Sequence, residues 1–153
     1  MVTIQTEKWA TFYLDGQAIF PQHHRELALH RQEIPLSIDE AKYELLDKTD
    51  MLLIVTARDE GRLVGYALWF IMPHPHYAQA GPMALTDMYY VLPEYRRGTG
   101  LRLFAASEVE YTRRGCIKAI TSCKAHQDHS KFLSAMGWTL SDLTFVKLLK
   151  RGA

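Results

Sequence analysis

The sequence lacks several features that mark special classes of protein. Its 153 residues include two cysteines, Cys116 and Cys123, which are too few for a disulfide-stabilised scaffold, so we expect reduced thiols and a cytoplasmic protein. The longest mainly apolar stretch, residues 63–72, is about half of the ~20 residues that span a bilayer. The first residues show no cationic segment followed by an apolar run. We therefore expect neither a membrane span nor a signal peptide.

An excess of charge of one sign is also missing. Eighteen Lys and Arg residues stand against seventeen Asp and Glu residues, which leaves a net charge of +1. A protein that coats nucleic acid needs a large cationic surface, so nucleic acid is not an expected partner. With 48% hydrophobic and 23% charged residues, the chain is neither disordered nor a coiled coil. Its length fits one domain over residues 1–153.

Hydrophobic periodicity predicts an α/β domain with a mixed sheet. Helices are predicted over residues 20–31, 38–46, 101–112 and 128–136, the second after the capping sequence Ser37-Ile38-Asp39-Glu40. Strands are predicted over residues 9–13, 51–56, 63–72, 84–91 and 116–122, with one or two closing strands in residues 138–149. Gly61 is expected in the turn of a hairpin between the second and third strands.

Residues 89–104, YYVLPEYRRGTGLRLF, are typical of an anion-binding loop. A strand ends at Val91, and two arginines and two glycines then precede an amphipathic helix. The glycines let successive N–H groups point at one spot, where the helix N-terminus adds partial positive charge. Arginines at the rim can pair with phosphates. The alternative is a solvated turn in which the glycines supply only positive φ.

The same residues resemble motif A of the GCN5-related N-acetyltransferases (GNAT family). Residues 61–66, GRLVGY, look like the central hairpin of that family, and residues 132–138, FLSAMGW, look like its motif B. The order of elements matches from about residue 37 to the end. Residues 76–98, together with Lys124-Ala125, Gly137-Trp138 and Asp142, most resemble small acetyltransferases encoded by phages and prophages.

The resemblance implies a GNAT-like mixed, mostly antiparallel central sheet with helices on both faces. It implies transfer of acetyl from acetyl-coenzyme A to a primary amine of a protein or small molecule, by direct attack in a ternary complex. A host protein is one candidate acceptor, and a homodimer is one candidate assembly. The residues that would bind the coenzyme are Tyr90, Val91, Arg96, Arg97, Gly98, Thr99, Gly100 and Leu101.

Two residues are candidates for the base that takes a proton from the amine. Asp87 lies within an otherwise apolar strand, and a carboxylate in such a place is either functional or a structural partner, for instance at a bulge. His76 precedes that strand, and because histidine is the usual acid–base side chain of enzymes at neutral pH, it is the reserve candidate. Many relatives carry a tyrosine as general acid where this chain has Leu133. A catalytically weak or inactive binding or regulatory protein of the same fold is therefore the alternative function.

A metal site is not predicted. His74 and His76 form one pair and His126 and His129 another, but neither has a cysteine or carboxylate at a spacing that would complete a site. Cys123 lies just past the end of the predicted strand and has no neighbouring base in sequence, although His126 is three residues away, so direct attack is expected rather than an acetylated cysteine.

Overall fold

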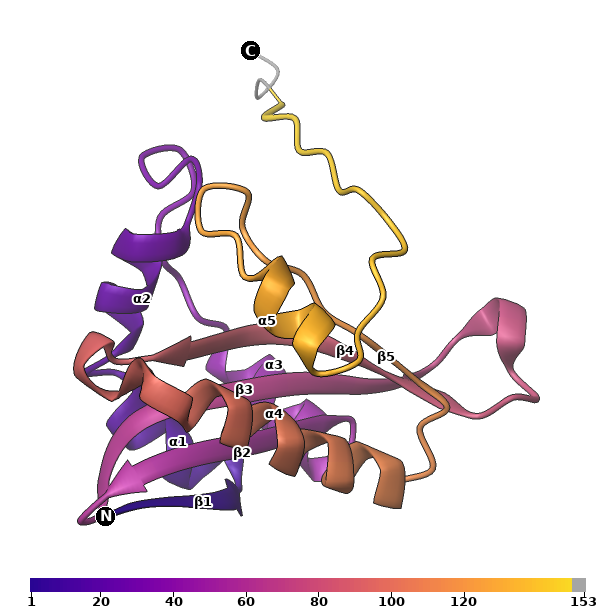
Figure 1. The fold of residues 1–153 in the computed structure, drawn as a ribbon, viewed down its shortest axis with the longest axis horizontal. Coiled ribbons are helices and arrows are strands. Elements are labelled where there is room, and N and C mark those ends of the chain that lie inside the picture. Colours follow the sequence, from indigo (N-terminus) through magenta and orange to yellow (C-terminus); the bar gives the residue numbers. More distant parts are fainter. Residues whose placement is uncertain (150–153) are drawn as a thin grey trace.

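The computed structural model describes residues 1–149 as a five-stranded sheet with helices on both faces (Figure 1). The strands are β1 (Val2–Glu7), β2 (Leu52–Asp59), β3 (Arg62–Pro73), β4 (Pro82–Val91) and β5 (Lys118–Ile120). The helices are α1 (Trp9–Gly16), α2 (Phe20–Leu27), α3 (Glu40–Lys48), α4 (Arg96–Arg113) and α5 (Ser130–Ala135), with short 3₁₀ turns η1 (Pro75–Tyr77) and η2 (Pro93–Tyr95). The spatial order follows the sequence, and only the β4–β5 pair is parallel. The predicted α/β fold with a mostly antiparallel sheet is confirmed.

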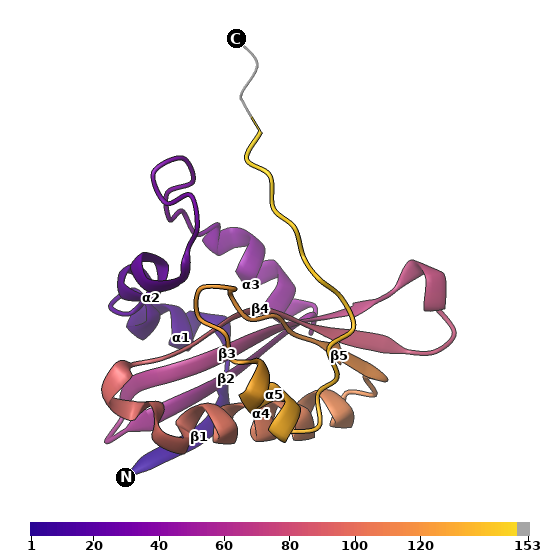
Figure 2. The ribbon, with the colours of Figure 1, turned by 45° about the horizontal axis from the view of Figure 1, so that its top comes forward.

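The central strand β3 sends alternate side chains to the two faces of the sheet. The Tyr66 ring lies 5.1 Å from Phe12 of α1, whereas the Trp69 ring lies 5.5 Å from Phe104 of α4. Figure 2 shows α1, α2 and α3 on one side of the sheet and α4 and α5 on the other. Because helices cover both faces, β2 and β3 are continuous apolar runs rather than alternating ones.

The N-terminal part of the chain corrects one prediction. Residues 9–13 are not a strand but the start of α1, in which Trp9 and Phe12 are buried one turn apart. A short apolar run is compatible with a strand or with a helix. Here the two buried residues, Trp9 and Phe12, are three positions apart, which is the spacing of one face of a helix. The first strand is β1, which pairs with β2. The helix predicted after residue 37 is present as α3, but it begins at Glu40 and its N-cap is Asp39 instead of Ser37. The Asp39 side chain accepts a hydrogen bond from the Lys42 N–H at 3.2 Å.

The C-terminal part of the chain corrects a second prediction. The strand predicted over residues 116–122 is present but spans only Lys118–Ile120, and α5 ends, as expected, before Gly137 at φ 86°. Beyond Trp138, residues 139–149 run in an extended conformation and form no strand within the described chain, so the predicted closing strands are wrong. Among residues 1–149, no helix combines the length and the apolar character needed to cross a membrane.

One buried ionic cluster fixes β1 and α1 to the central hairpin. The guanidinium of Arg58 donates to both carboxylate oxygens of Glu7, at 2.5 and 2.8 Å, and to Asp15 at 2.7 Å. It also donates to the Gly61 carbonyl in the hairpin turn. The Glu7 side chain is only 4% exposed. Although burial acts to raise the pKa of Glu7, its hydrogen bonds, chiefly from Arg58, bring that pKa below its usual range.

We predict that Arg58→Ala lowers the free energy of unfolding by about 3 kcal/mol, because it leaves the Glu7 carboxylate buried without its cation. Urea denaturation at pH 7 measures this. Arg113→Ala, which removes an exposed pair with Glu110, is the control and should change stability by less than about 0.5 kcal/mol. Since the Glu7 pKa is lowered in the fold, the difference between wild type and Arg58→Ala should shrink as the pH falls below about 4.5. Equal loss in the two variants would contradict this role of Arg58.

Candidate active site

The site lies where β4 and β5 separate. The two strands pair only between Met83–Leu85 and Lys118–Ile120. Farther along, two side chains of β4 cross the gap: the Thr86 hydroxyl donates to the Ile120 carbonyl and the Tyr89 hydroxyl to the Ser122 carbonyl, each at 3.0 Å. In the described chain no strand pairs with β4 on this side beyond Leu85, so part of its backbone edge is open.

The orientation of the backbone along this open edge follows from strand alternation. The Leu92 N–H donates to the Val64 carbonyl of the β3 segment at 2.9 Å. Successive N–H groups of a strand point to opposite sides, so the Tyr90 N–H also faces β3. The N–H groups of Tyr89 and Val91 consequently point into the gap between β4 and β5.

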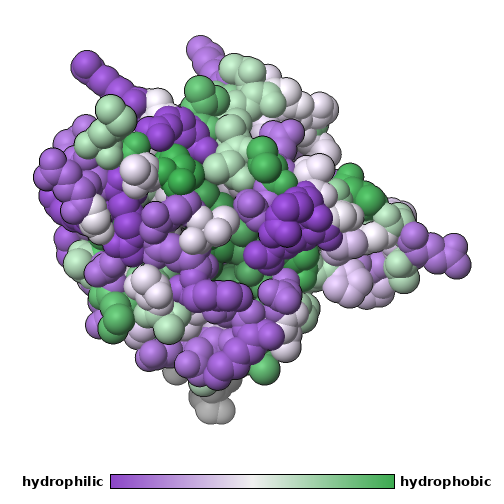
Figure 3. Space-filling view, turned by 90° about the horizontal axis from the view of Figure 1, so that it is seen from below, coloured by the Kyte–Doolittle hydropathy of each residue, from purple (hydrophilic) through white to green (hydrophobic). Residues whose placement is uncertain are grey.

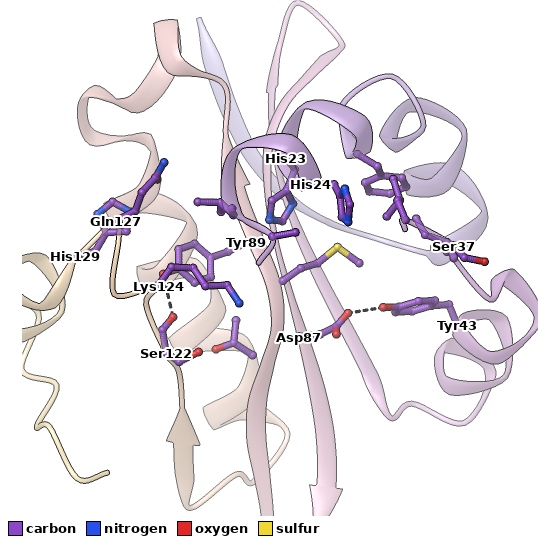
Figure 4. A pocket seen from close by; sticks show the side chains of 17 residues that line it. His23, His24, Ser37, Tyr43, Asp87, Tyr89, Ser122, Lys124, Gln127 and His129 are labelled. Atoms are coloured by element: carbon purple, nitrogen blue, oxygen red, sulfur yellow. Dashed lines mark hydrogen bonds between the residues drawn. The ribbon is translucent and has the colours of Figure 1, made fainter. Parts of the chain in front are cut away.

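A pocket of about 360 Å³ opens beside this part of β4 (Figure 4). One wall comes from α2 and the start of α3, the floor from residues 86–89 of β4, and the other wall from residues 122–129. Its lining is mainly apolar, with two charged groups, Asp87 and Lys124, and three histidines. In Figure 4 the Lys124 side chain reaches into the pocket from the 122–129 wall, and Asp87 lies on the side of Tyr43.

Asp87 occupies a β-bulge in β4. Leu68 of β3 pairs with Met88 and Trp69 pairs with Thr86, which leaves Asp87 as the extra residue between them. A bulge bends the strand and redirects the side chain of the extra residue. The carboxylate thereby points into the pocket instead of continuing the regular pattern of the sheet.

The electrostatics of Asp87 combine two opposing effects. Desolvation by the surrounding protein raises the pKa of its carboxyl, and the hydrogen bond that the Tyr43 hydroxyl donates to Oδ2 at 2.6 Å lowers it, with a net rise. The side chain remains accessible from the pocket. Asp87 is therefore a solvent-reachable carboxyl that is a stronger base than an ordinary aspartate.

His76 lies elsewhere. It belongs to η1, in the β3–β4 connection that projects from the body of the protein (Figure 1), and its ring packs against those of His74 and Tyr77. It does not line the pocket. The structure thus brings Asp87, but not His76, to the pocket.

The glycine loop follows β4 directly. Within the segment assigned to α4, Arg97 and Gly98 are not helical, and Gly98 has φ 84°, a conformation that favours glycine. A Cβ atom built at Gly98 or Gly100 would meet nothing within 4 Å. The regular helix begins after Gly98, so its first N–H groups face an open space at its N-terminus. Thr99 is buried and Leu101 is half exposed.

The two arginines of this loop are in different situations. The Arg96 guanidinium donates to Glu26 of α2 at 2.6 Å and to the Val91 carbonyl at 3.0 Å, and lies over the Tyr90 ring. The Arg97 side chain is exposed and has no ion-pair partner among residues 1–149. Of the two predicted phosphate ligands, only Arg97 is thus unengaged.

Glu26 joins three parts of the site. Its carboxylate accepts hydrogen bonds from Arg96, from the Tyr90 hydroxyl at 2.6 Å and from the Gln127 side chain at 3.3 Å. Burial acts to raise its pKa, but these donors bring it below the usual range. Burial and Glu26 together raise the pKa of Tyr90 to about 12. We define Glu26, Tyr90, Arg96 and Gln127 as the Glu26 cluster.

His23 is a neutral component of the pocket wall. Its ring stacks on Tyr90 at a centroid distance of 4.8 Å, and Nδ1 lies 2.7 Å from the Tyr66 hydroxyl. Burial lowers the pKa of His23 to about 4. His23 is therefore uncharged at neutral pH.

Leu133, Cys123 and Asp142, which the sequence singled out, do not line the pocket. Leu133 on α5 packs against the core and has no acidic proton to offer. The Cys123 thiol lies 3.7 Å from Asp128 and does not line the pocket. Asp142 lies on the exposed C-terminal segment. Within residues 1–149, no group of three or more His, Cys, Asp or Glu side chains could hold a metal ion.

Residues 9–138 match the sequence profile of the Acetyltransferase (GNAT) family. Among solved structures, the chain resembles a ribosomal-protein-alanine N-acetyltransferase from Brucella melitensis biovar Abortus 2308, with 18% identity, TM-score 0.70 and coverage of 99% of this chain and 100% of the other. An aminoglycoside acetyltransferase from an uncultured soil metagenomic sample, in complex with trehalose, gives 15% identity, TM-score 0.74 and 97% of both chains. AAC(6')-Iy, in complex with a bisubstrate analogue, gives 22% identity, TM-score 0.68 and 99% of both chains. No curated protein sequence matches.

The chain belongs to the GNAT family, because the profile covers most of its length. It is an acyl-coenzyme A-dependent N-acetyltransferase, and acetyl-coenzyme A is its cosubstrate.

We predict that Tyr43→Phe raises the pKa of the Asp87 carboxyl, because the hydrogen bond from Tyr43 stabilises the carboxylate. Loss of a bond of this kind corresponds to about one pKa unit. A carboxyl-carbon NMR titration of Asp87 measures the shift. Tyr77→Phe, on the projecting β3–β4 connection, is the control and should leave the titration unchanged. An Asp87 pKa that is equal in Tyr43→Phe and wild type would show that this hydrogen bond does not form in solution.

Proposed function

We propose that the protein acetylates a primary amine bound in the pocket beside β4, by direct attack within a ternary complex. One observation carries this proposal: a single strand, β4, presents Asp87 to the pocket at a bulge and leads directly into the glycine loop. The proton acceptor and the anion-binding loop therefore lie along a single strand. Holding two substrates in a fixed relative position supplies much of the rate of a two-substrate reaction.

The glycine loop is proposed to bind the pyrophosphate of the coenzyme. The open space at Gly98 and Gly100 allows close approach of a phosphate to the backbone, where the N–H groups of residues 97–101 and the helix N-terminus favour an anion. Arg97 is available for a charge-assisted hydrogen bond. Arg96 can join it only by leaving Glu26, so its contribution to binding should be the smaller of the two.

Asp87 is proposed to accept the proton that the amine must lose before or during attack. Its raised pKa strengthens it as a base. The amine nitrogen forms a bond to the thioester carbonyl carbon, the C–S bond breaks, and the thiolate takes a proton from water. Two N–H groups aimed into the gap, those of Tyr89 and Val91, are proposed to stabilise the negative charge that develops on the carbonyl oxygen. Tyr90, whose N–H faces β3, would contribute through its side-chain cluster instead.

The charges of the pocket bear on the acceptor. Among the described residues that line the pocket, Asp87 is the one carboxylate and Lys124 adds positive charge. The carboxylate of Glu26 is not among the lining residues and is bonded within its own cluster. A polycationic acceptor such as an aminoglycoside would need several carboxylates to offset its charge. The lining therefore supports an amine with one positive charge and an apolar neighbouring group, as a protein or peptide provides.

The alternative is a catalytically weak or inactive binding protein, which the absence of an acidic proton at Leu133 keeps open. An acceptor screen that measures release of coenzyme A thiol, followed by mass analysis of the product, separates the two functions. The panel should contain peptides with free N-termini, peptides with internal lysines, polyamines and aminoglycosides. Tight coenzyme binding with no acetylated product from any of these would favour the binding protein.

We predict that Arg97→Ala weakens coenzyme A binding about tenfold, or ~1.4 kcal/mol, because it removes the unengaged arginine of the loop. Gly100→Val should abolish binding without lowering the melting temperature substantially, since a Cβ atom at this position meets no other atom within 4 Å. Isothermal titration calorimetry measures both. Arg102→Ala, at an exposed arginine one turn further along α4, is the control and should bind normally. Unchanged affinity in both loop variants would place the pyrophosphate elsewhere.

We predict that Asp87→Asn lowers kcat/KM by about 10²-fold or more, the usual contribution of a general base. In the wild type, activity should fall as the pH drops through the raised pKa of Asp87, because protonation removes the base; this acidic limb should disappear in the variant. Asp142→Asn serves as the control. If Asp87→Asn folds normally and retains activity and the acidic limb, Asp87 is structural and a bound water is the base, because His76 lies away from the pocket.

A further inference from the structure

The pocket beside β4 holds two opposite charges that do not pair with each other. Asp87 and Lys124 both line it, and within residues 1–149 no ion pair joins them or connects Lys124 to another carboxylate. In Figure 4 the Lys124 side chain reaches inward from the 122–129 wall, whereas Asp87 lies on the side of Tyr43, its hydrogen-bond donor. The pocket therefore has a negative side and a positive side.

The backbone that carries Lys124 is held at the pocket. Lys124 and Gln127 form an isolated bridge, and the Gln127 N–H donates to the Lys124 carbonyl at 2.9 Å. The Gln127 side chain in turn donates to Glu26 of α2 at 3.3 Å. The turn of residues 124–127 is thus bonded to the helix that forms the opposite wall. The lysine therefore starts from a fixed position at the edge of the pocket, and its side chain remains accessible to a ligand.

The charge of Lys124 acts on the interior of the pocket. Burial is the main cause of the lowered pKa of His23, and the charge of Lys124 lowers that pKa further. Apolar side chains such as Phe20, Leu27 and Ile38 complete much of the lining. The face shown in Figure 3 differs, since hydrophilic residues dominate it and hydrophobic ones form separate small areas. A cation beside apolar groups attracts an anion more strongly than a cation surrounded by water, because the effective dielectric constant is lower.

We propose that Lys124 selects acceptors that carry a carboxylate close to the amine to be acetylated. This inference rests on the function proposed above, in which Asp87 receives the amine. The carboxylate of the same acceptor would then pair with the Lys124 ammonium through a charge-assisted hydrogen bond, which is stronger than a neutral one. A second cation on the acceptor would instead be repelled by Lys124, so the same residue also discriminates against polyamines.

The chemical class is therefore an acceptor with one amine and one carboxylate joined by a short spacer. A peptide with a free N-terminus and an acidic second residue meets this description, and so does a free amino acid. Both offer the same pair of charges, and they differ in whether the acceptor continues beyond the pocket.

A set of matched acceptors tests this selection. Three amidated peptides have a free N-terminal alanine and differ only in the second residue, which is glutamate, glutamine or arginine; free glutamate is the small-molecule probe. Release of coenzyme A thiol gives kcat/KM, and mass analysis identifies the product. The wild type should acetylate the glutamate peptide with a kcat/KM about tenfold above that of the glutamine peptide, and the arginine peptide should be slower still. The ratio between the glutamate peptide and free glutamate shows which source supplies the carboxylate.

Exchange of the charge should reverse the preference. Lys124→Glu should acetylate the arginine peptide faster than the glutamate peptide. Lys131→Glu makes the same change of charge at an exposed position of α5 outside the pocket, so it is the control and should keep the wild-type order. Equal kcat/KM for the three peptides in the wild type, or the wild-type order in Lys124→Glu, would overturn the inference and leave the proposed function intact. If no probe is acetylated by the wild type, the proposed function fails and the inference fails with it.

Calorimetry with coenzyme A alone decides whether Lys124 serves the coenzyme instead. Lys124→Met removes the charge and keeps an unbranched side chain. It should bind coenzyme A with the affinity of the wild type, because the phosphates are proposed to lie at the glycine loop. A loss as large as that expected for Arg97→Ala would assign Lys124 to the coenzyme and overturn its role in acceptor selection. This measurement requires no acetyl transfer.

Discussion

The separation of β4 from β5 after Leu85 is the constraint on which the rest of the site depends. Over its first residues β4 has a paired strand on each side, but farther along β3 is its one strand partner within the described chain. One-sided pairing leaves backbone N–H groups directed into a gap, and it gives the strand room for the bulge at Asp87. The pocket and the base candidate Asp87 lie along this half of β4, and the glycine loop follows it directly. The end of the pairing between β4 and β5 therefore leaves space for the whole candidate site.

The Glu26 cluster compensates for that missing pairing. Where backbone hydrogen bonds to β5 end, the Glu26 carboxylate connects α2 to Tyr90 of β4, to Arg96 at the start of the glycine loop and to Gln127 on the opposite wall. Any change that draws Arg96 toward a bound anion must weaken its bond to Glu26. The wall of the pocket and the glycine loop are therefore physically connected through one carboxylate.

The sequence was sufficient for the local features and insufficient for the distant contacts. The glycine loop was predictable because its residues are consecutive, and Asp87 stood out because an acid interrupts an apolar strand. Tyr43 and Glu26 were missed, since their partners Asp87 and Arg96 lie 44 and 70 positions away, and neither residue has a local signal. His76 was a reasonable candidate by sequence distance, but the long β3–β4 connection carries it away from the pocket.

The C-terminal segment shows a different limit of sequence analysis. The apolar content of residues 138–149 predicted closing strands, and in the described chain none forms. An apolar pattern of this kind predicts covered side chains and a paired backbone, but it does not identify a neighbouring strand. Within the described chain β5 is paired on one side only, and residues 139–149 form no strand along its other edge. The prediction failed because periodicity reports which side chains are apolar, and not whether a strand lies within reach to pair with them.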